Sequence, residues 1–236
     1  MYKIDNEKIL FSDNKLFAIL PSVDFGSTCA IYKVRVGKDI YALKLFNGLQ
    51  RVTLDGCKEL QKLNIESYIS PIKLIYINDR FKGYAMKFCE GRSLAFRKLD
   101  LSIDEFAAST VKLLEDTEKL SEEKFRVFDG YLTNGMYDNG FKMIDMDDYD
   151  YLPNTPLSEI QIKNRKRINK FLKDVFVKNT RLFDIRDEKI KNAIEECEKG
   201  EMLFDEVFNI ICSSAYNITD TEITNLSDVG KVLSKK

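Results

Sequence analysis

The sequence contains no histidine and no tryptophan. Histidine has the side-chain pKa closest to neutrality, and it is the commonest metal ligand among the amino acids. Its absence therefore excludes Ser-His-Asp and Cys-His activation of a nucleophile, and it excludes zinc, copper, haem and non-haem iron sites that depend on histidine. Any chemistry in this protein must run on carboxylates, lysine, amides, hydroxyls or thiols.

An excess of charge of one sign is also missing. The chain has 37 Lys and Arg against 38 Asp and Glu, which gives a formal net charge of −1. A protein with balanced charge has no overall field that recruits nucleic acid, so nucleic acid is not an expected partner. Charged residues make up 32% of the chain, above the usual ~25%, which predicts a well-hydrated surface.

Long apolar runs and cysteine pairs are lacking as well. No run approaches the ~18 apolar residues of a membrane span, and Met1 to Leu20 lacks the apolar core of a signal peptide. The five cysteines are an odd number, widely spaced, with no C-x-x-C pair. These features predict a cytoplasmic protein with reduced thiols and no membrane partner. At 236 residues, it should bury roughly 70 to 75% of its unfolded surface.

The first part of the chain, up to about Phe88, has the short apolar and alternating runs of β-strands. Gly37-Lys38 and Asn78-Asp79-Arg80 each separate two such runs and predict hairpins. Between the hairpins, apolar residues recur every three positions from Leu54 to Leu63, which predicts a short helix. The expected strands are Ala30–Val36, Asp39–Phe46, Ile72–Ile77 and Gly83–Phe88.

Beyond Gly91 the apolar residues follow a helical period. Ser102 and Glu105 form a capping-box pattern at the start of one helix, and Thr155-Pro156 predicts the N-cap and first residue of another. Another predicted helix ends at Gly200. The fold class is therefore α+β, with two lobes: a small β-rich N-lobe at residues 1–88 and a mainly helical C-lobe at residues 89–236.

One β feature interrupts the helical part. Asn139-Gly140 is the strongest hairpin signal in the chain, and taking it as a two-residue turn places Asp138 opposite Phe141 and Asn134 opposite Asp145. Because opposed side chains lie roughly 5 Å apart, the amide oxygen of Asn134 and the carboxylate of Asp145 would lie close together. Both are hard oxygen ligands, which suit a Mg²⁺ ion that is also held by substrate phosphates. The alternative is a solvated acidic loop of turn-forming residues. A calcium loop is disfavoured by Tyr149 and Asp150, which stand where an acid and a glycine are needed.

Lys44 is the only charged residue in the apolar run Tyr41–Phe46. An ammonium there is costly unless an anion meets it, and the hairpin register places Lys44 opposite Ile31, just beyond the turn at Gly26. Lys44 could thus reach the phosphates of a nucleotide beneath that turn. Glu59 is the leading candidate for its ion-pair partner and Glu66 the second. The alternative is a lysine that extends to solvent from an edge strand.

In chain order these elements are a turn over a hairpin, a strand lysine, a helix glutamate, an apolar strand, the D-x4-N segment Asp129–Asn134, and a hairpin leading to Ile144-Asp145-Met146-Asp147. The series resembles the protein-kinase-like superfamily. It looks most like compact bacterial-type atypical kinases, with a catalytic loop similar to that of aminoglycoside and choline phosphotransferases. The resemblance covers about residues 24 to 147.

The resemblance implies a phosphotransferase that uses ATP and Mg²⁺ and transfers the γ-phosphoryl group to a hydroxyl. Lys44 would contact the α and β phosphates, Asp129 would orient or deprotonate the acceptor, and Asn134 and Asp145 would bind Mg²⁺. Asp129, Lys44 and Asn134 are then the catalytic residues. The hinge Met86–Cys89 would bind adenine. The nucleotide-binding residues would be Gly26, Ser27, Ile31, Ala42, Lys44, Glu59, Met86, Lys87, Phe88 and Cys89. Met86 has an alternative interpretation as an ordinary core residue.

Several positions depart from the superfamily pattern. The glycine-rich loop keeps only Gly26, Phe128 stands where a histidine often precedes the catalytic aspartate, and Asp147 replaces a glycine. No A-P-E segment follows Asp145, so regulation by loop phosphorylation is not expected. The loss of loop glycines leaves a second hypothesis, a pseudokinase that binds nucleotide or a partner, and a third is nucleotidyl transfer. A basic run from Lys163 to Lys173 is either a solvated face or a surface for an anionic substrate or partner.

Overall fold

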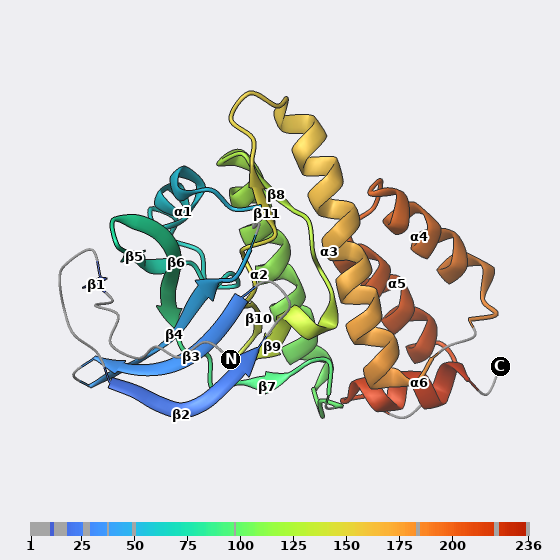
Figure 1. Ribbon diagram of the computed structural model, residues 1–236. Coiled ribbons are helices and arrows are strands. Elements are labelled where there is room, and N and C mark those ends of the chain that lie inside the picture. The colour runs from blue at the N-terminus through green and yellow to red at the C-terminus, as the bar shows by residue number, and fades with distance from the viewer. Residues whose placement is uncertain are drawn as a thin grey trace.

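The computed structural model describes residues 10–11, 18–25, 29–36, 38–48, 51–96, 98–182, 185–219 and 222–234. Its N-terminal part is a six-stranded antiparallel sheet in the order β1-β5-β6-β4-β3-β2, with the short helix α1 beside it (Figure 1). The elements are β1 (Leu10–Phe11), β2 (Ala18–Phe25), β3 (Cys29–Val36), β4 (Asp39–Phe46), α1 (Leu54–Leu60), β5 (Pro71–Ile77) and β6 (Arg80–Lys87).

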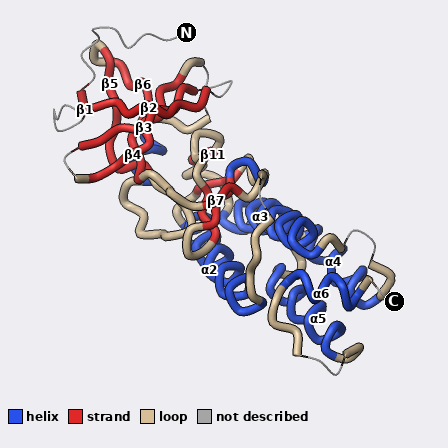
Figure 2. Tube along the Cα trace, turned by 90° about the horizontal axis from the view of Figure 1, so that it is seen from below, coloured by secondary structure: helices blue, strands red, loops and turns tan. Residues whose placement is uncertain are grey.

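The C-terminal part is mainly helical, with short strand pairs between it and the sheet (Figure 2). β7 pairs with β9, β9 with β10, and β8 with β11. The elements are β7 (Arg92–Ser93), α2 (Ile103–Glu122), β8 (Phe125–Val127), the 3₁₀ turn η1 (Leu132–Asn134), β9 (Gly135–Tyr137), β10 (Phe141–Met143), β11 (Tyr149–Tyr151), α3 (Leu157–Thr180), α4 (Glu188–Lys199), α5 (Phe204–Tyr216) and α6 (Leu226–Leu233). The α+β, bilobal expectation is confirmed. No described helix is long and apolar enough to cross a membrane.

The two N-terminal hairpins form where the sequence predicts them. The β3–β4 register is confirmed, with Ile31 opposite Lys44. The β5–β6 turn is one residue shorter than expected, because Arg80 already pairs with Ile77. Asn78 and Asp79 both take positive φ values, 50° and 60°, the conformation a two-residue turn between twisted strands requires. Asn and Asp tolerate that conformation better than most residues.

The sheet has two different faces because side chains alternate along a strand. Ala42 and Phe46 of β4 belong to the main core, which extends into the helical lobe, and Lys44 lies between them on the same face. Leu43 points the opposite way, into a smaller core shared with Tyr32 and other residues of the outer face. Lys44 is thus directed toward the helical lobe and away from the outer surface.

The helix boundaries largely follow their capping signals. Ser102 and Glu105 form the expected capping box of α2, and α4 ends at Gly200, whose φ is +78°. The expectation for Thr155-Pro156 is wrong by one residue. Pro156 is itself the N-cap, with ψ of 135°, and α3 begins at Leu157. The preference of proline for the first helical position gives way here to an extended backbone.

Candidate functional site

Lys44 is the centre of a buried charge cluster. Its side chain is 1% exposed, and its Nζ lies 2.6 Å from Oδ1 of Asp145 and also donates to Oδ1 of Asp147. Tyr84, opposite Lys44 on β6, donates its hydroxyl to the same Asp147 oxygen at 3.0 Å. The strands approach closely because residue 83 is glycine: a Cβ there would lie 1.9 Å from the Lys44 carbonyl oxygen. The expected anion beside Lys44 is therefore a pair of carboxylates.

The pKa values of the Asp145 and Asp147 carboxyl groups shift in opposite directions. Burial raises the pKa of Asp145 to about 6, and in its protonated form it hydrogen-bonds Asp147, whose negative charge adds to the shift. Burial also acts to raise the pKa of Asp147, but bonds from Asp145, Lys44 and Tyr84 outweigh it and leave that pKa below its ordinary value. The pKa of Lys44 is raised, because Asp147 and Asp145 outweigh the effect of burial.

The expected ion pair between Lys44 and Glu59 is wrong in this structure. Glu59 lies on α1, and its carboxylate forms an ion pair with Lys62, one helical turn further along, at 2.6 Å. The buried face of α1 consists of Gly56, Cys57 and Leu60 and does not include Glu59. Glu66, the second candidate, is exposed. The partners of Lys44 instead come from the segment after β10.

The sequence pattern does not predict Asp147 as a partner of Lys44, since Asp147 stands where the superfamily carries a glycine. Its side chain is 5% exposed, and its carbonyl oxygen accepts hydrogen bonds from the Arg51 and Val52 amides at 3.1 and 2.9 Å. Asp147 therefore joins β4, β6 and the segment before α1. The spacing Asp145-x-Asp147 was the available signal, since a second acid two residues on can point to the same lysine.

The D-x4-N segment is positioned by α3. Asn164 of α3 is fully buried; its Oδ1 accepts from the Val127 amide at 2.8 Å, and its Nδ2 donates to Ser121 Oγ and the Phe125 carbonyl. β8 is thereby held against the helix, two residues before Asp129. An asparagine within the apolar stripe of a helix was the signal that could have identified this role.

Asp129 and Asn134 do come together. The Asp129 carboxylate accepts the Tyr131 amide at 3.2 Å and a bond from the Asn134 side chain. Burial raises the pKa of Asp129, the nearby Asp145 adds to the shift, and Arg167 opposes it. Asp129, Asn134 and Asp145 thus lie within electrostatic reach of one another, as the D-x4-N pattern predicts.

The register proposed for the Asn139-Gly140 hairpin is wrong by one residue. Tyr137, and not Asp138, faces Phe141, and the Ile144 amide bonds the Asn134 carbonyl at 2.9 Å. The loop therefore contains three residues, Asp138 to Gly140, instead of two. The φ of Gly140, +137°, differs from the left-handed value that the second residue of a two-residue type I′ turn requires. Asn134 consequently lies opposite Ile144, one position before Asp145, and its η1 turn brings its side chain to Asp129.

Of the expected nucleotide-binding residues, Ile31, Ala42, Lys44 and Met86 lie on one face of the sheet, whereas Glu59 lies on α1 and Lys87 on the opposite face of β6. Ala42 of β4 pairs with Met86 of β6, and both belong to the main core, with Ile31 packed against it. The Phe88 amide donates to the Ile40 carbonyl at 3.2 Å, and the Phe88 ring lies under the Lys33 ammonium. That amide is already engaged, so a base at the hinge would use other groups of Lys87 and Cys89. Gly26 and Ser27 lie outside the described residues.

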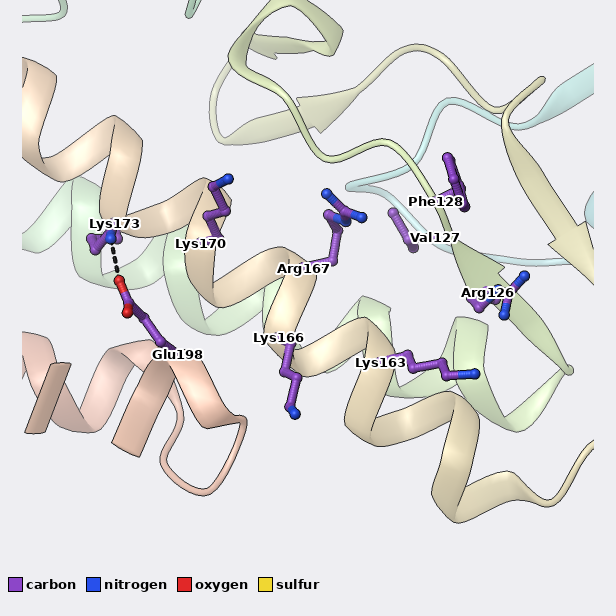
Figure 3. A pocket seen from close by; sticks show the side chains of 9 residues that line it. All are labelled: Arg126, Val127, Phe128, Lys163, Lys166, Arg167, Lys170, Lys173 and Glu198. Carbon is purple, nitrogen blue, oxygen red and sulfur yellow. Dashed lines mark hydrogen bonds and ion pairs between the residues drawn. The ribbon is translucent and has the colours of Figure 1, made fainter. Parts of the chain in front are cut away.

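A pocket of about 640 Å³ lies beside the D-x4-N segment, between α3 and β8 (Figure 3). Phe128, the residue before Asp129, lies at its edge and is 39% exposed. The Arg51 guanidinium stacks on the Phe128 ring at 3.4 Å, and Arg167 lies 6.0 Å from it on the helix side. Within the described part of the chain, no group of three or more His, Cys, Asp and Glu side chains is arranged to hold a metal ion.

Comparison with known structures shows the fold. The chain is similar to the autoinhibited serine kinase domain of the giant muscle protein titin, with a TM-score of 0.54 and 15% identity over 93% of this chain and 80% of that one. No protein-family model matches the sequence, and a search of curated proteins finds no match. At this identity the likeness supports a protein-kinase-like fold, while the narrower bacterial-type assignment stays a prediction.

Proposed function

We propose that this chain, which has a protein-kinase-like fold, is a phosphotransferase that transfers the γ-phosphoryl group of ATP to a hydroxyl acceptor with the help of Mg²⁺. The observation that carries the proposal is the convergence of Lys44, Asp145, Asp129 and Asn134, drawn from β4, the segment after β10 and the D-x4-N segment. Phosphoryl transfer depends on positioning and charge stabilisation, and it needs no histidine.

The chain's own groups supply the required roles. Asp129 accepts the proton of the acceptor hydroxyl while the hydroxyl oxygen forms a bond to the γ-phosphorus of ATP. The bond between the γ-phosphorus and the β–γ bridging oxygen breaks, and ADP leaves with the electron pair. Lys44 stabilises the negative charge of the phosphates. Asp145 and Asn134 offer a carboxylate and an amide, hard oxygen ligands that suit Mg²⁺, and the bound ion would neutralise charge on the phosphates. With a pKa of about 6, Asp145 is mainly ionised at neutral pH and can serve as that ligand.

A second candidate is a pseudokinase that binds nucleotide or a partner without transferring phosphate. The observation that favours it is the closed cluster in which Asp145 and Asp147 both hold Lys44. Phosphates could reach Lys44 only in competition with these carboxylates. Transfer of labelled phosphate from ATP that disappears in Asp129→Asn would exclude this candidate.

Nucleotide binding is tested by thermal shift with ATP, with and without Mg²⁺. A ligand at 100 times its dissociation constant stabilises a protein by about 2.7 kcal/mol, and at roughly 2 to 4 °C per kcal/mol for this length we expect a shift of about 5 to 10 °C. The Mg²⁺-dependent part of the shift should vanish in Asp145→Asn. Asp100→Asn, which removes an exposed carboxylate far along the chain from the site, is the matched control.

Two results would contradict the proposal. A wild-type protein that shows no shift with ATP and Mg²⁺ does not use this nucleotide. An equal shift in Asp145→Asn would remove Asp145 from the metal site.

A further inference from the structure

The pocket beside Asp129 has an unbalanced charge. Among the residues that the structure describes, six cationic side chains line it together with a single carboxylate, that of Glu198. Three of the cations are neutralised locally: Arg126 binds Asp150, Lys163 binds Glu159 at 2.5 Å, and Lys173 binds Glu198. The cations left over are Lys166, Arg167 and Lys170.

These three residues lie together on α3. Lys166 and Lys170 are one helical turn apart, so their Cβ atoms are neighbours at roughly 5 to 6 Å. Both are exposed, and among the described residues neither has a carboxylate within ion-pair distance. Figure 3 shows Arg167 extending from α3 toward Val127 and Phe128 on the facing segment. Lys170 extends from the same side of α3 as Arg167, whereas Lys166 extends from the other side, toward Gly200 (Figure 3). Lys170 and Arg167, which have no carboxylate within ion-pair distance among the described residues, form the part of the pocket that an anion would neutralise.

The charged face is continuous with the proposed catalytic residue. Arg167 packs directly over Gly130, where an added Cβ would lie 2.8 Å from the Arg167 side chain, and its charge acts on Asp129. Asp129 itself adjoins Phe128 at the edge of the pocket. A ligand seated on Lys170 and Arg167 would therefore extend toward Asp129.

We infer that this pocket binds the acceptor, and that the acceptor is a small organic anion, a phosphate ester or a carboxylate, that also carries a free hydroxyl. The inference rests on the proposed function and adds its substrate class. A volume of about 640 Å³ falls in the range of small-molecule sites. A cationic acceptor would be repelled by the charges of Lys166, Arg167 and Lys170. The balanced net charge gives no support for a nucleic acid as the ligand.

The test uses calorimetric titration of the full chain with glucose 6-phosphate, citrate and uncharged glucose. We expect one or both anions to bind and glucose to bind at least tenfold more weakly. Arg167→Gln/Lys170→Gln should weaken the anion about tenfold, since each exposed charge pair contributes up to about 1 kcal/mol. Lys82→Gln/Lys189→Gln removes two exposed lysines elsewhere and should leave the affinity unchanged. Preference for the phosphate ester or for citrate identifies the anionic group.

Parallel thermal shifts with ATP and Mg²⁺ separate this inference from the proposed function. If the nucleotide shift is present but no anion binds, or if the anion binds equally to both double variants, the anionic acceptor site is refuted and the kinase proposal stands. An anion displaced competitively by ATP occupies the nucleotide site, which also refutes it. Anion binding that depends on Arg167 and Lys170 in a protein that fails to bind ATP supports the pocket and refutes the kinase proposal.

Discussion

At the scale of single residues, Lys44 is opposed by more negative charge than it can neutralise. It meets Asp145 and Asp147 together, and Asp129 and Asp148 lie close enough to act on the same carboxyl groups. The pKa values of Asp145, Asp129 and Asp148 are all raised, in each case first by burial. Such an arrangement is costly for folding and is typical of sites built to receive a cation or to move a proton.

This cost predicts how stability depends on pH. Asp145 has a pKa of about 6 in the folded protein against about 4 when unfolded, so the folded state binds more protons between these values. Stability contributed by this group should be highest below pH 4 and should fall by about 2 to 3 kcal/mol as pH rises through 6. Asp145→Asn imitates the protonated form, so it should be more stable than the wild type at pH 8 and similar to it at pH 4.

Urea unfolding at pH 4, 6 and 8 measures the effect. Asp100→Asn, with an exposed side chain, should follow the wild type throughout. An Asp145→Asn protein that is less stable than the wild type at pH 8 would show that the Lys44–Asp145 ion pair outweighs the cost of burying the second carboxylate.

At the scale of elements, the site depends on a segment that connects α1 to β5. Ser67 and Ile69 in this segment bond Met143 of β10 through the backbone, at 2.7 and 2.9 Å, two residues before Asp145. Asp116 of α2 holds the segment in place, because its carboxylate is fully buried and accepts the amides of Glu66 and Ser67 at 3.0 and 2.9 Å. The position of Asp145 therefore depends on α2.

Asp116→Ala should lower the free energy of unfolding by about 3 kcal/mol, because it leaves the buried Ser67 amide and the partly buried Glu66 amide without their charged acceptor. Glu115→Ala, the exposed neighbour on the same helix, should change it by less than about 0.5 kcal/mol.

The contribution of Asp116 should also depend on pH. Hydrogen bonds from Ser67 and Glu66, with the charge of Lys112, outweigh burial and hold the pKa of Asp116 below its ordinary value. Its contribution is thus present above about pH 4 and is lost as pH falls below it. Chemical denaturation at pH 7 and pH 3 tests both statements, and an Asp116 variant as stable as the Glu115 variant at pH 7 would contradict them.

The elements also show what a sequence can predict. The β3–β4 register followed from Gly37-Lys38 and two apolar runs, because local turn chemistry and alternation determine it. The β9–β10 register did not follow from Asn139-Gly140, since a two-residue and a three-residue loop share that signal and differ by one position. The partners of Lys44 did not follow either: Asp145 and Asp147 are about a hundred residues away, so no local pattern determines which acid meets the lysine, although the spacing Asp145-x-Asp147 signals that the two acids share a direction.

At the scale of the whole molecule, a balanced net charge conceals a strong separation. The acidic cluster from Asp145 to Asp148 and the basic face of α3 both lie near Asp129, and, besides burial, Asp145 raises the pKa of Asp129 while Arg167 lowers it. The proposed roles use both, since a metal and phosphates are expected on the acidic side and an anionic acceptor on the basic side. The opposite charges of these two surfaces nearly cancel in the formal net charge of −1, so the composition does not reveal either surface.

The two lobes share one core. Ala42, Phe46 and Met86 of the sheet belong to the same continuous cluster as Phe106 of α2 and Val229 of α6. Phe106 alone contacts the rings of Phe141, Phe176, Phe204 and Phe208, at centroid distances of 5.6, 6.0, 6.3 and 4.9 Å. A division at residues 88 and 89 would cut through this core, so we expect the lobes to unfold together.

Calorimetry distinguishes one cooperative unit from two. For 236 residues at about 0.7 kcal/mol per residue near 60 °C, the unfolding enthalpy should be roughly 165 kcal/mol. In a single transition the van 't Hoff enthalpy equals this value, whereas independent lobes would show roughly 60 and 100 kcal/mol in separate transitions. We expect equality in the full chain, and a further test is Phe46→Ala, which removes a sheet residue from the shared core. If the lobes are one unit, this variant lowers a single melting temperature; if only an N-terminal transition moves and a C-terminal one remains in place, the lobes fold separately.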